Sequence, residues 1–298
     1  MVPDNRMHES DSIFPFNRLK SRSGTGPVSG HGREALFFRV FGINKNRSIY
    51  LFDLIRELIV RNIKLAYKDS ALGIMWSLIT PLLQLFIFYF LFQKVFSLNI
   101  SRYSLFTFSG ILAWTWFQAS LNQAVQVVRG SRELVKQPNF PSIVLPAAAV
   151  GGNLINFLIA IIVLMGFLFL SGTVPGLSLI ELPAVMAVQF FFTLSLSYLL
   201  AAMNIVFLDT QHILGVALQL YFFVTPIVYD VSSVPERYRS FYNMNPMTHL
   251  LGAYRNILMD DKFSPPIPLI SILALSFCLL WGSMRFYRKM SYRFVEEL

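Results

Sequence analysis

Polar and aromatic side chains recur at helical spacing inside long apolar runs of this sequence. Three stripes of this kind occur: Ser77, Thr80, Gln84 and Phe88; Trp114, Gln118 and Asn122; and Tyr221, Thr225 and Tyr229. Hydroxyl and amide groups can hydrogen-bond a polar molecule, and aromatic faces stack on sugar rings, whereas polar groups are unfavourable against lipid. Each stripe alone is also what helix–helix packing produces. Together they favour a substrate path for something bulky and polar.

Residue sets for covalent or acid–base chemistry are not evident. The four histidines stand apart at positions 8, 31, 212 and 249, and Cys/His spacing typical of a metal site is absent from the sequence. The phosphate-loop pattern G-x-x-x-x-G-K-[S/T] is also absent. We therefore expect no catalytic residue, no cofactor or metal site in this chain, and no ATP hydrolysis by it. The single cysteine, Cys278, is expected to be a buried packing residue.

Long apolar runs dominate the 298 residues. Hydrophobic residues make up 55% of the sequence and charged residues 14%, and a membrane-spanning helix needs about 20 mostly apolar residues. Six runs qualify, and they predict an all-α polytopic membrane protein with a transmembrane domain over 73–288. The expected spans are about 73–97, 105–128, 142–170, 181–207, 213–229 and 266–286.

The net charge of +9 is distributed in a way that argues against nucleic-acid binding. Most of the 25 Lys and Arg lie before residue 73, in 129–136 or in 285–293, which is one side of a six-span arrangement. The remaining six, among them Arg255, fall on the other side. Because short basic loops stay in the cytoplasm, we expect both termini there, including a C-terminal segment 289–298.

The first 72 residues divide into a tail and a helix. Residues 1–48 are expected to form a cytoplasmic tail, largely disordered at its start, because Ser, Gly, Pro and Arg dominate there. In 49–72, apolar residues recur at steps of three and four opposite a stripe that contains Arg61, Lys64 and Lys68. This pattern predicts an amphipathic interface helix, with its apolar face in the lipid boundary and its basic face towards anionic headgroups.

Two connections between the spans carry helical patterns of their own. Residues 129–136 predict about two turns of amphipathic helix ended by Pro138. A plain solvated loop and a docking element for a cytoplasmic partner fit that segment equally well. Residues 230–260 predict two short helices that dip part-way into the outer leaflet, with a cavity on the outer side, because each apolar stretch is too short to span.

Four stretches taken together resemble the permease subunit of ABC-2 type exporters, in the branch that exports O-antigen, capsular polysaccharide and teichoic acid. They are "LIVRNIKLAYKDSALGIMWSLITPLL", "LFTFSGILAWTWFQASLNQAV" followed by "LVKQPNFPSIVLP", "LDTQHILGVALQLYFFVTPIVYDVSSVPERYR" and "NMNPMTHLLGAYRNILM". They cover most of residues 51–260. Two features depart from the family pattern: Leu208 stands where an Arg commonly precedes Asp209, which weakens a role for an Arg–Asp pair, and the tail before residue 34 has no counterpart.

The resemblance implies an ABC-2 (type V exporter) fold that works as a homodimer with two copies of a separate ABC ATPase, which holds ATP and Mg²⁺. The implied cargo is a polyprenyl-pyrophosphate-linked polysaccharide, moved from cytoplasm to periplasm across the bacterial inner membrane during lipopolysaccharide biosynthesis. The implied ATPase-coupling residues are Arg129, Arg132, Glu133, Lys136 and Phe140. Arg61, Lys64 and Lys68 would attract the pyrophosphate, and residues 230–260 would form two re-entrant periplasmic helices.

Two alternatives stay open. An ABC-2 permease that exports a small amphipathic drug or a lipo-oligosaccharide would have the same fold and the same partners. An ion-coupled carrier or a membrane-embedded enzyme would usually have internal repeats and charged residues at mid-membrane. That second alternative is less favoured, because Glu181 and Asp209 lie at the edges of the expected spans.

Overall fold

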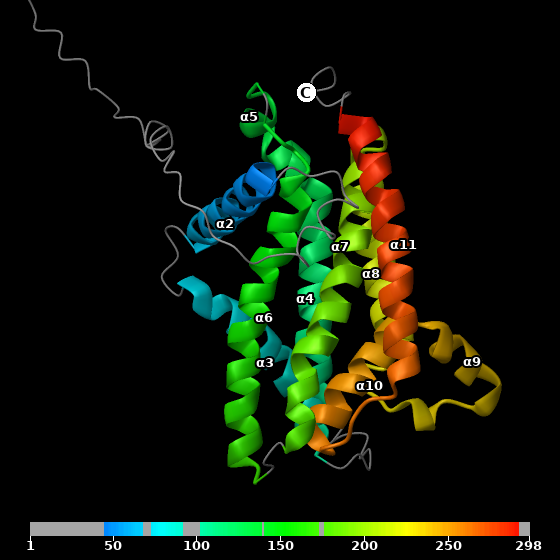
Figure 1. Cartoon of the computed structure of the whole chain (residues 1–298). Helices are drawn as coiled ribbons and strands as arrows, with labels where there is room; N and C mark the ends of the chain where they lie inside the picture. Colours follow the sequence, from blue (N-terminus) through cyan, green and yellow to red (C-terminus); the bar gives the residue numbers. More distant parts are fainter. Residues whose placement is uncertain (1–44, 68–72, 92–101, 139, 173–175, 292–298) are drawn as a thin grey trace, which may run out of the picture. The chain divides into compact units, whose positions relative to one another are not determined.

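The computed structural model describes residues 45–67, 73–91, 102–138, 140–172 and 176–291. The helices in these ranges are α2 (Lys45–Tyr67), α3 (Trp76–Phe88), α4 (Tyr103–Gly130), α5 (Arg132–Val135), α6 (Val144–Leu170), α7 (Leu182–Val206), α8 (Thr210–Val224), α9 (Glu236–Met244), α10 (Pro246–Met259) and α11 (Pro266–Ser291) (Figure 1). Short 3₁₀ turns are η2 (Gly73–Met75), η4 (Leu177–Glu181) and η5 (Val231–Ser233). The all-helical prediction is confirmed for the described residues.

The helix boundaries agree with most of the predicted runs. Helices α4, α6, α7 and α11 coincide with the second, third, fourth and sixth runs to within a few residues. Three stretches in the described ranges are long and apolar enough to cross a membrane: Val144–Leu170, Leu177–Val206 and Pro266–Met290. Shorter apolar helices occupy Leu78–Leu91 and Thr210–Val224. Of the expected tail, only residues 45–48 are described, and they form the first turn of α2.

Helix α4 is the centre of the main core. It contacts α3, α6, α7, α8 and α10, and its own buried residues, which are mostly apolar or small, lie on nearly every side of the helix. A helix of this kind is stable only when other helices enclose it. Aromatic rings provide much of the contact: Trp116 stacks on Phe157 of α6 at 4.8 Å between ring centroids, and Phe117 stacks on Phe192 of α7 at 5.8 Å.

A second core cluster joins α2, the connection between α4 and α6, and the neighbouring ends of α7 and α11. Its buried members include Leu58, Val135, Leu145, Tyr198 and Tyr287. Figure 1 shows α2, α5 and the end of α11 at the same end of the bundle. We call this group the α2–α5 end cluster, and it lies at the end that we expect to face the cytoplasm.

The apolar stripe of α2 packs against the bundle. Stripe members in the α2–α5 end cluster or packed against it are Leu51, Leu54, Ile55, Leu58 and Ile59. Ile59 lies over Gly151 of α6, where an added Cβ would come within 2.8 Å of Ile59 Cδ1. The glycine on α6 thus lets α2 approach closely, and of these stripe residues Leu58 is buried while the others are half-buried. That the helix lies in the lipid boundary stays a prediction.

Cys278 also differs from expectation. Its side chain is exposed on α11, whereas the sequence predicted a buried packing residue. Helix α11 packs on α7, and the exposed residues of α11 include the large apolar side chains of Ile270, Phe277 and Trp281. An apolar run has the same composition whether it faces protein or lipid, so composition alone could not place the cysteine.

Candidate functional site

The stripes on α3, α4 and α8 meet in an aromatic cluster, which comprises Phe88, Trp114, Phe117, Tyr221 and Phe222. The Trp114 ring lies 5.5 Å from Tyr221 and 5.7 Å from Phe222 between centroids, and Phe88 stacks on Phe222 at 5.9 Å. Trp114 Nε1 donates a hydrogen bond to Gln118 Oε1 at 2.9 Å. Four predicted path residues from three helices are thus brought together around Trp114.

The other predicted path residues on α3 and α4 lie outside this cluster. Thr80 and Gln84 are exposed on α3, and Asn122 is half-buried further along α4. The side chain of Ser77 lies outside the described part of the chain. Trp114 itself is 3% exposed, so in a single copy of the chain it packs between helices and only its neighbours reach the surface.

The stripe predicted on the fifth run is not a face of one helix. Helix α8 ends at Val224, and Thr225 has an extended backbone with ψ of 133°. Thr225 precedes Pro226, and a residue before proline is disfavoured in the helical region. Of the predicted stripe, only Tyr221 belongs to α8. Thr225 and Tyr229 lie in the turn that follows the helix, so the prediction of one helical stripe is wrong for these two residues.

The backbone after α8 is buried without being helical. Thr225 and Ile227 have no exposed surface, and Tyr103 OH donates to Val228 O at 3.1 Å. Arg255 Nη2 donates to Ile227 O at 2.8 Å, and Asn245 Nδ2 donates to Thr225 Oγ1 at 3.1 Å. Buried backbone that is not helical needs hydrogen-bond partners from elsewhere in the protein, and here Tyr103 of α4 and Arg255 of α10 provide them.

Arg255 is a buried cation that sequence reasoning missed. It is 9% exposed, and its guanidinium carbon lies 3.4 Å from the centroid of the Phe106 ring. A cation over an aromatic face is attracted by the ring quadrupole. The available signal was its position within the apolar stretch "MTHLLGAYRNILM", where a solvated arginine would be out of place.

Gly110 of α4 makes room for this arrangement. A Cβ at that position would lie 2.9 Å from Arg255 Nη2 and 3.0 Å from Ile227 O. Both distances are shorter than ordinary van der Waals contact, and the second atom belongs to the backbone. The glycine is therefore a packing requirement of the turn, and nothing in the periodicity of α4 indicated it.

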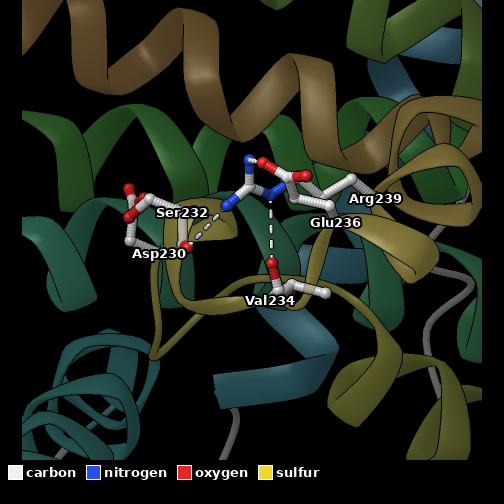
Figure 2. Close-up of polar contacts among 5 residues, drawn as sticks. All are labelled: Asp230, Ser232, Val234, Glu236 and Arg239. Atoms are coloured by element: carbon white, nitrogen blue, oxygen red, sulfur yellow. Dashed lines mark hydrogen bonds and ion pairs between the residues drawn. The ribbon is translucent and has the colours of Figure 1, made fainter.

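The connection before α9 is braced by Arg239 (Figure 2). Arg239 Nε donates to Val234 O at 3.0 Å, and Nη2 donates to Ser232 O at 3.1 Å. Glu236 Oε1 lies 3.7 Å from Arg239 Nη1. A hollow of about 480 Å³ beside this connection is lined by Tyr229, Ser233, Val234, Pro235, Tyr238, Phe241 and Tyr242. Figure 1 shows α9 in the half of the bundle remote from α5, where the sequence predicts a cavity on the outer side.

Two carboxylates tie the loop between α10 and α11 to η4. Asp261 Oδ1 accepts from Ser178 N at 3.1 Å, and Glu181 Oε2 accepts from Ser264 N at 2.9 Å. The hydroxyl and the backbone N–H of Ser178 hold the pKa of the Asp261 carboxyl below its usual range. Because a lowered pKa favours the charged form, the Asp261 contact is present at neutral pH and is lost only as the carboxyl is protonated in acid.

At the opposite end, residues 131–143 form the α4–α6 connection, of which Asn139 lies outside the described residues. Arg129 belongs to the last turn of α4, and α5 is a single turn rather than the two predicted turns. The break comes at Ser131, whose φ of −111° and ψ of 30° leave the helical region. Glu133 is exposed on α5, and Phe140 is half-buried against the α2–α5 end cluster.

The remaining predicted coupling residues and the basic residues of α2 lie at the surface. Arg129, Arg132 and Lys136 are exposed around α5, and Arg61 and Lys64 are exposed on α2. Lys68 lies outside the described residues. In the described part of the chain, no group of three or more His, Cys, Asp and Glu side chains is placed to hold a metal ion.

Comparison with known proteins agrees with the four stretches that carry the resemblance. The O-antigen export system permease protein RfbA of Myxococcus xanthus is 32% identical over 255 residues, which are 85% of this chain and 98% of that protein. An O-antigen export system permease protein RfbA of Klebsiella pneumoniae is 32% identical over 251 residues, 84% of this chain and 96% of that protein. The polysialic acid transport protein KpsM of Escherichia coli is 20% identical over 238 residues, 78% of this chain and 92% of that protein.

A family profile described as ABC-2 type transporter matches residues 53–259. That range runs from α2 through the aromatic cluster and the α4–α6 connection to the last residue of α10, so it includes most of the elements described above. The resemblance that the sequence predicted is confirmed. The chain belongs to the ABC-2 type transporter family.

Proposed function

We propose that this chain is the permease subunit of an ATP-driven exporter that moves O-antigen or a similar polysaccharide, carried on polyprenyl pyrophosphate, from cytoplasm to periplasm. The observation that carries the proposal is the 32% identity to O-antigen export permeases over nearly their whole length. A separate ABC ATPase would bind ATP and Mg²⁺ and hydrolyse the ATP. The chain would lie in the bacterial inner membrane with both termini in the cytoplasm.

The proposed membrane arrangement has six spans, formed by α3, α4, α6, α7, α8 and α11. Helices α9 and α10 would be the re-entrant pair on the periplasmic side. The burial of Met247, Leu250 and Tyr254 supports this role for α10, because a short helix can enter the membrane only where protein encloses it.

The working unit would be a homodimer with α3 and α8 at its seam. Both helices leave large apolar side chains exposed in a single copy, including Phe86 and Ile87 on α3 and Leu220 and Phe223 on α8. The buried residues of α8 are only Thr210, Leu214 and Leu218. Apolar faces of this size require lipid or a second copy of the chain.

The proposed path runs beside the aromatic cluster. Thr80 and Gln84 are exposed on the helix that also carries Phe88, and a polar side chain on a spanning helix is unfavourable against lipid. In the dimer these groups would face the partner copy and the glycan. Exposed Arg61 and Lys64 of α2 would attract the pyrophosphate at the entrance, together with Lys68.

Depletion of this chain tests the cargo. In depleted cells, the full-length lipid-linked glycan is expected to accumulate on the cytoplasmic face of the inner membrane, because its only route outward is lost. Spheroplasts treated with a glycan-cleaving enzyme check this, since the enzyme reaches glycan only on the periplasmic face. Normal glycan at the cell surface would contradict the proposal and would favour a small amphipathic cargo.

The docking role of α5 predicts a second result. The double substitution Glu133→Ala and Lys136→Ala is expected to lower export about tenfold or more while leaving the amount of folded permease unchanged, because both side chains are exposed. Alanine at both members of an exposed acidic–basic pair at the far end, Asp260→Ala and Lys262→Ala, is the matched control. Unchanged export in the α5 variant would show that the ATPase docks elsewhere.

A further inference from the structure

Two buried tyrosines hold the end of the α4–α6 connection. Tyr198 OH of α7 donates to Ile143 O at 2.6 Å, and Tyr287 OH of α11 donates to Ser142 O at 3.0 Å. Their rings meet edge to face at 5.5 Å between centroids. Tyr198 is 4% exposed and Tyr287 is fully buried. Consecutive carbonyls of one connection are thus bonded to two different helices.

The contact at Ser142 has a local cause. In a continuing helix, the N–H of residue 146 would donate to the carbonyl of residue 142, but Pro146 has no N–H. The Ser142 carbonyl accepts from Leu145 N at 3.1 Å, and the Tyr287 hydroxyl is a second donor to the same oxygen. A hydroxyl from another helix therefore replaces a bond that the backbone cannot make.

The same connection carries the residues assigned to ATPase docking. Within α5, Val135 is buried in the α2–α5 end cluster and Leu134 packs against it, as do Phe140 and Ile143 further along the connection. The connection is therefore bound to α7 and α11 by two hydrogen bonds as well as by apolar packing. Interiors packed in this way transmit displacement rather than absorbing it.

Helices α7 and α11 are joined again further along, and α7 reaches the aromatic cluster. Phe191 of α7 contacts Phe277 of α11 at 4.9 Å between centroids. Gln189 Nε2 donates to Ala113 O of α4 at 2.8 Å, and Phe192 stacks on Phe117 of that cluster. A continuous series of contacts thus leads from the α4–α6 connection through α7 to the proposed path.

We propose that Tyr198 and Tyr287 are positioning residues that make the α4–α6 connection move as one body with the cytoplasmic ends of α7 and α11. The inference rests on the proposed function, because the ATPase supplies the displacement. Through these two hydroxyls, movement of α5 reaches α7 and then the aromatic cluster. Spatial continuity alone does not establish energetic coupling, so the hydroxyls must be tested separately from the packing.

The first test uses the double variant Tyr198→Phe and Tyr287→Phe, which keeps both rings and removes both hydroxyls. In the reconstituted complex with the ATPase, glycan exported per ATP hydrolysed is expected to fall about fivefold or more. The KM for ATP and the amount of bound ATPase are expected to stay unchanged, because neither tyrosine is at the surface. Equal export per ATP in the variant and the wild type would overturn the inference.

Pro146→Ala separates a positioning role from a structural one. It restores an N–H that can bond Ser142 O, so combined with Tyr287→Phe it is expected to recover the thermal stability lost with the hydroxyl. Export per ATP is expected to stay low, because the link to α11 is still missing. Recovery of export together with stability would show that Tyr287 only satisfies a carbonyl, which overturns the proposal for this residue.

Spin labels provide a readout that does not depend on the cargo. Labels would be placed at Gln137→Cys, just after α5, and Lys289→Cys on α11, with the exposed Cys278 changed to alanine. The distance is expected to stay constant upon ATP binding in the wild-type background and to change in the double tyrosine variant. If the distance stays constant in both backgrounds, this inference is overturned and the proposed function still stands. A wild-type complex without permease-dependent ATP hydrolysis would overturn the proposed function, and this inference with it.

Discussion

Replacing Arg255 with methionine is expected to lower the free energy of unfolding by about 1–3 kcal/mol, which is the cost of leaving a buried acceptor without its donor. Methionine keeps most of the side-chain volume, so the change removes the bond to Ile227 O and the contact with the Phe106 ring rather than the packing. Removing the charge also removes its desolvation cost, which offsets part of the loss. The remaining loss of stability comes from the buried turn after α8, where Ile227 O is left without the Arg255 donor.

A second arginine, which lies over a tyrosine ring at the surface, provides the matched control. Arg237 lies 4.5 Å from the centroid of the Tyr238 ring, but it is exposed on α9. Arg237→Met is expected to change stability by less than about 0.5 kcal/mol, as for most surface substitutions. Apparent melting temperatures of the purified variants in one detergent measure both effects. Equal values would mean that Arg255 does not support the turn.

Alanine at Gly110 is expected to be destabilising by about 1–3 kcal/mol, the range for overpacking a close-packed site. The new Cβ would lie 3.0 Å from Ile227 O, a backbone atom that cannot move aside without displacing the turn. It would also press on Arg255 Nη2, which is already held between that carbonyl and the Phe106 ring. Export is expected to fall with stability, because the turn positions Tyr229 and the connection to α9.

Gly252 of α10 is the control for this substitution. A Cβ there has no neighbour within 4 Å, and alanine favours a helix over glycine by about 1 kcal/mol. Gly252→Ala is therefore expected to be neutral or stabilising. The comparison uses melting temperature and the fraction of protein that elutes as a single species. If both alanines behave alike, the close approach at Gly110 is not required for folding.

Helix type and approximate position followed from periodicity and length. The runs at 142–170 and 181–207 became α6 and α7 because about 20 consecutive apolar residues have few alternatives to a helix in lipid. The amphipathic pattern before residue 72 correctly gave a helix. It could not decide whether the apolar stripe meets lipid or protein, since both environments select the same residues.

The helix ends were less predictable where a single residue decided them. Helix α8 was expected to reach 229, but Pro226 ends it, and Thr225 and Tyr229 leave the predicted face. The segment 129–136 was expected to form two helical turns, but the helical conformation is interrupted at Ser131. Apolar composition continues past Pro226, so a window average extends α8 beyond its real end. Around Ser131 the residues are polar, and the helical spacing of the side chains on either side does not reveal the interruption.

The class of protein, the order of its helices and the family follow from the amino-acid sequence, because they depend on apolar run length, charge placement and local residue patterns. The pairing of polar groups across helices is visible only in the folded chain. Arg255 was counted as an outer charge and is a buried partner of Ile227 O. Tyr198 and Tyr287 reach the carbonyls of residues 143 and 142 from helices far along the chain. Such pairs depend on how helices pack in three dimensions, and no local pattern records that.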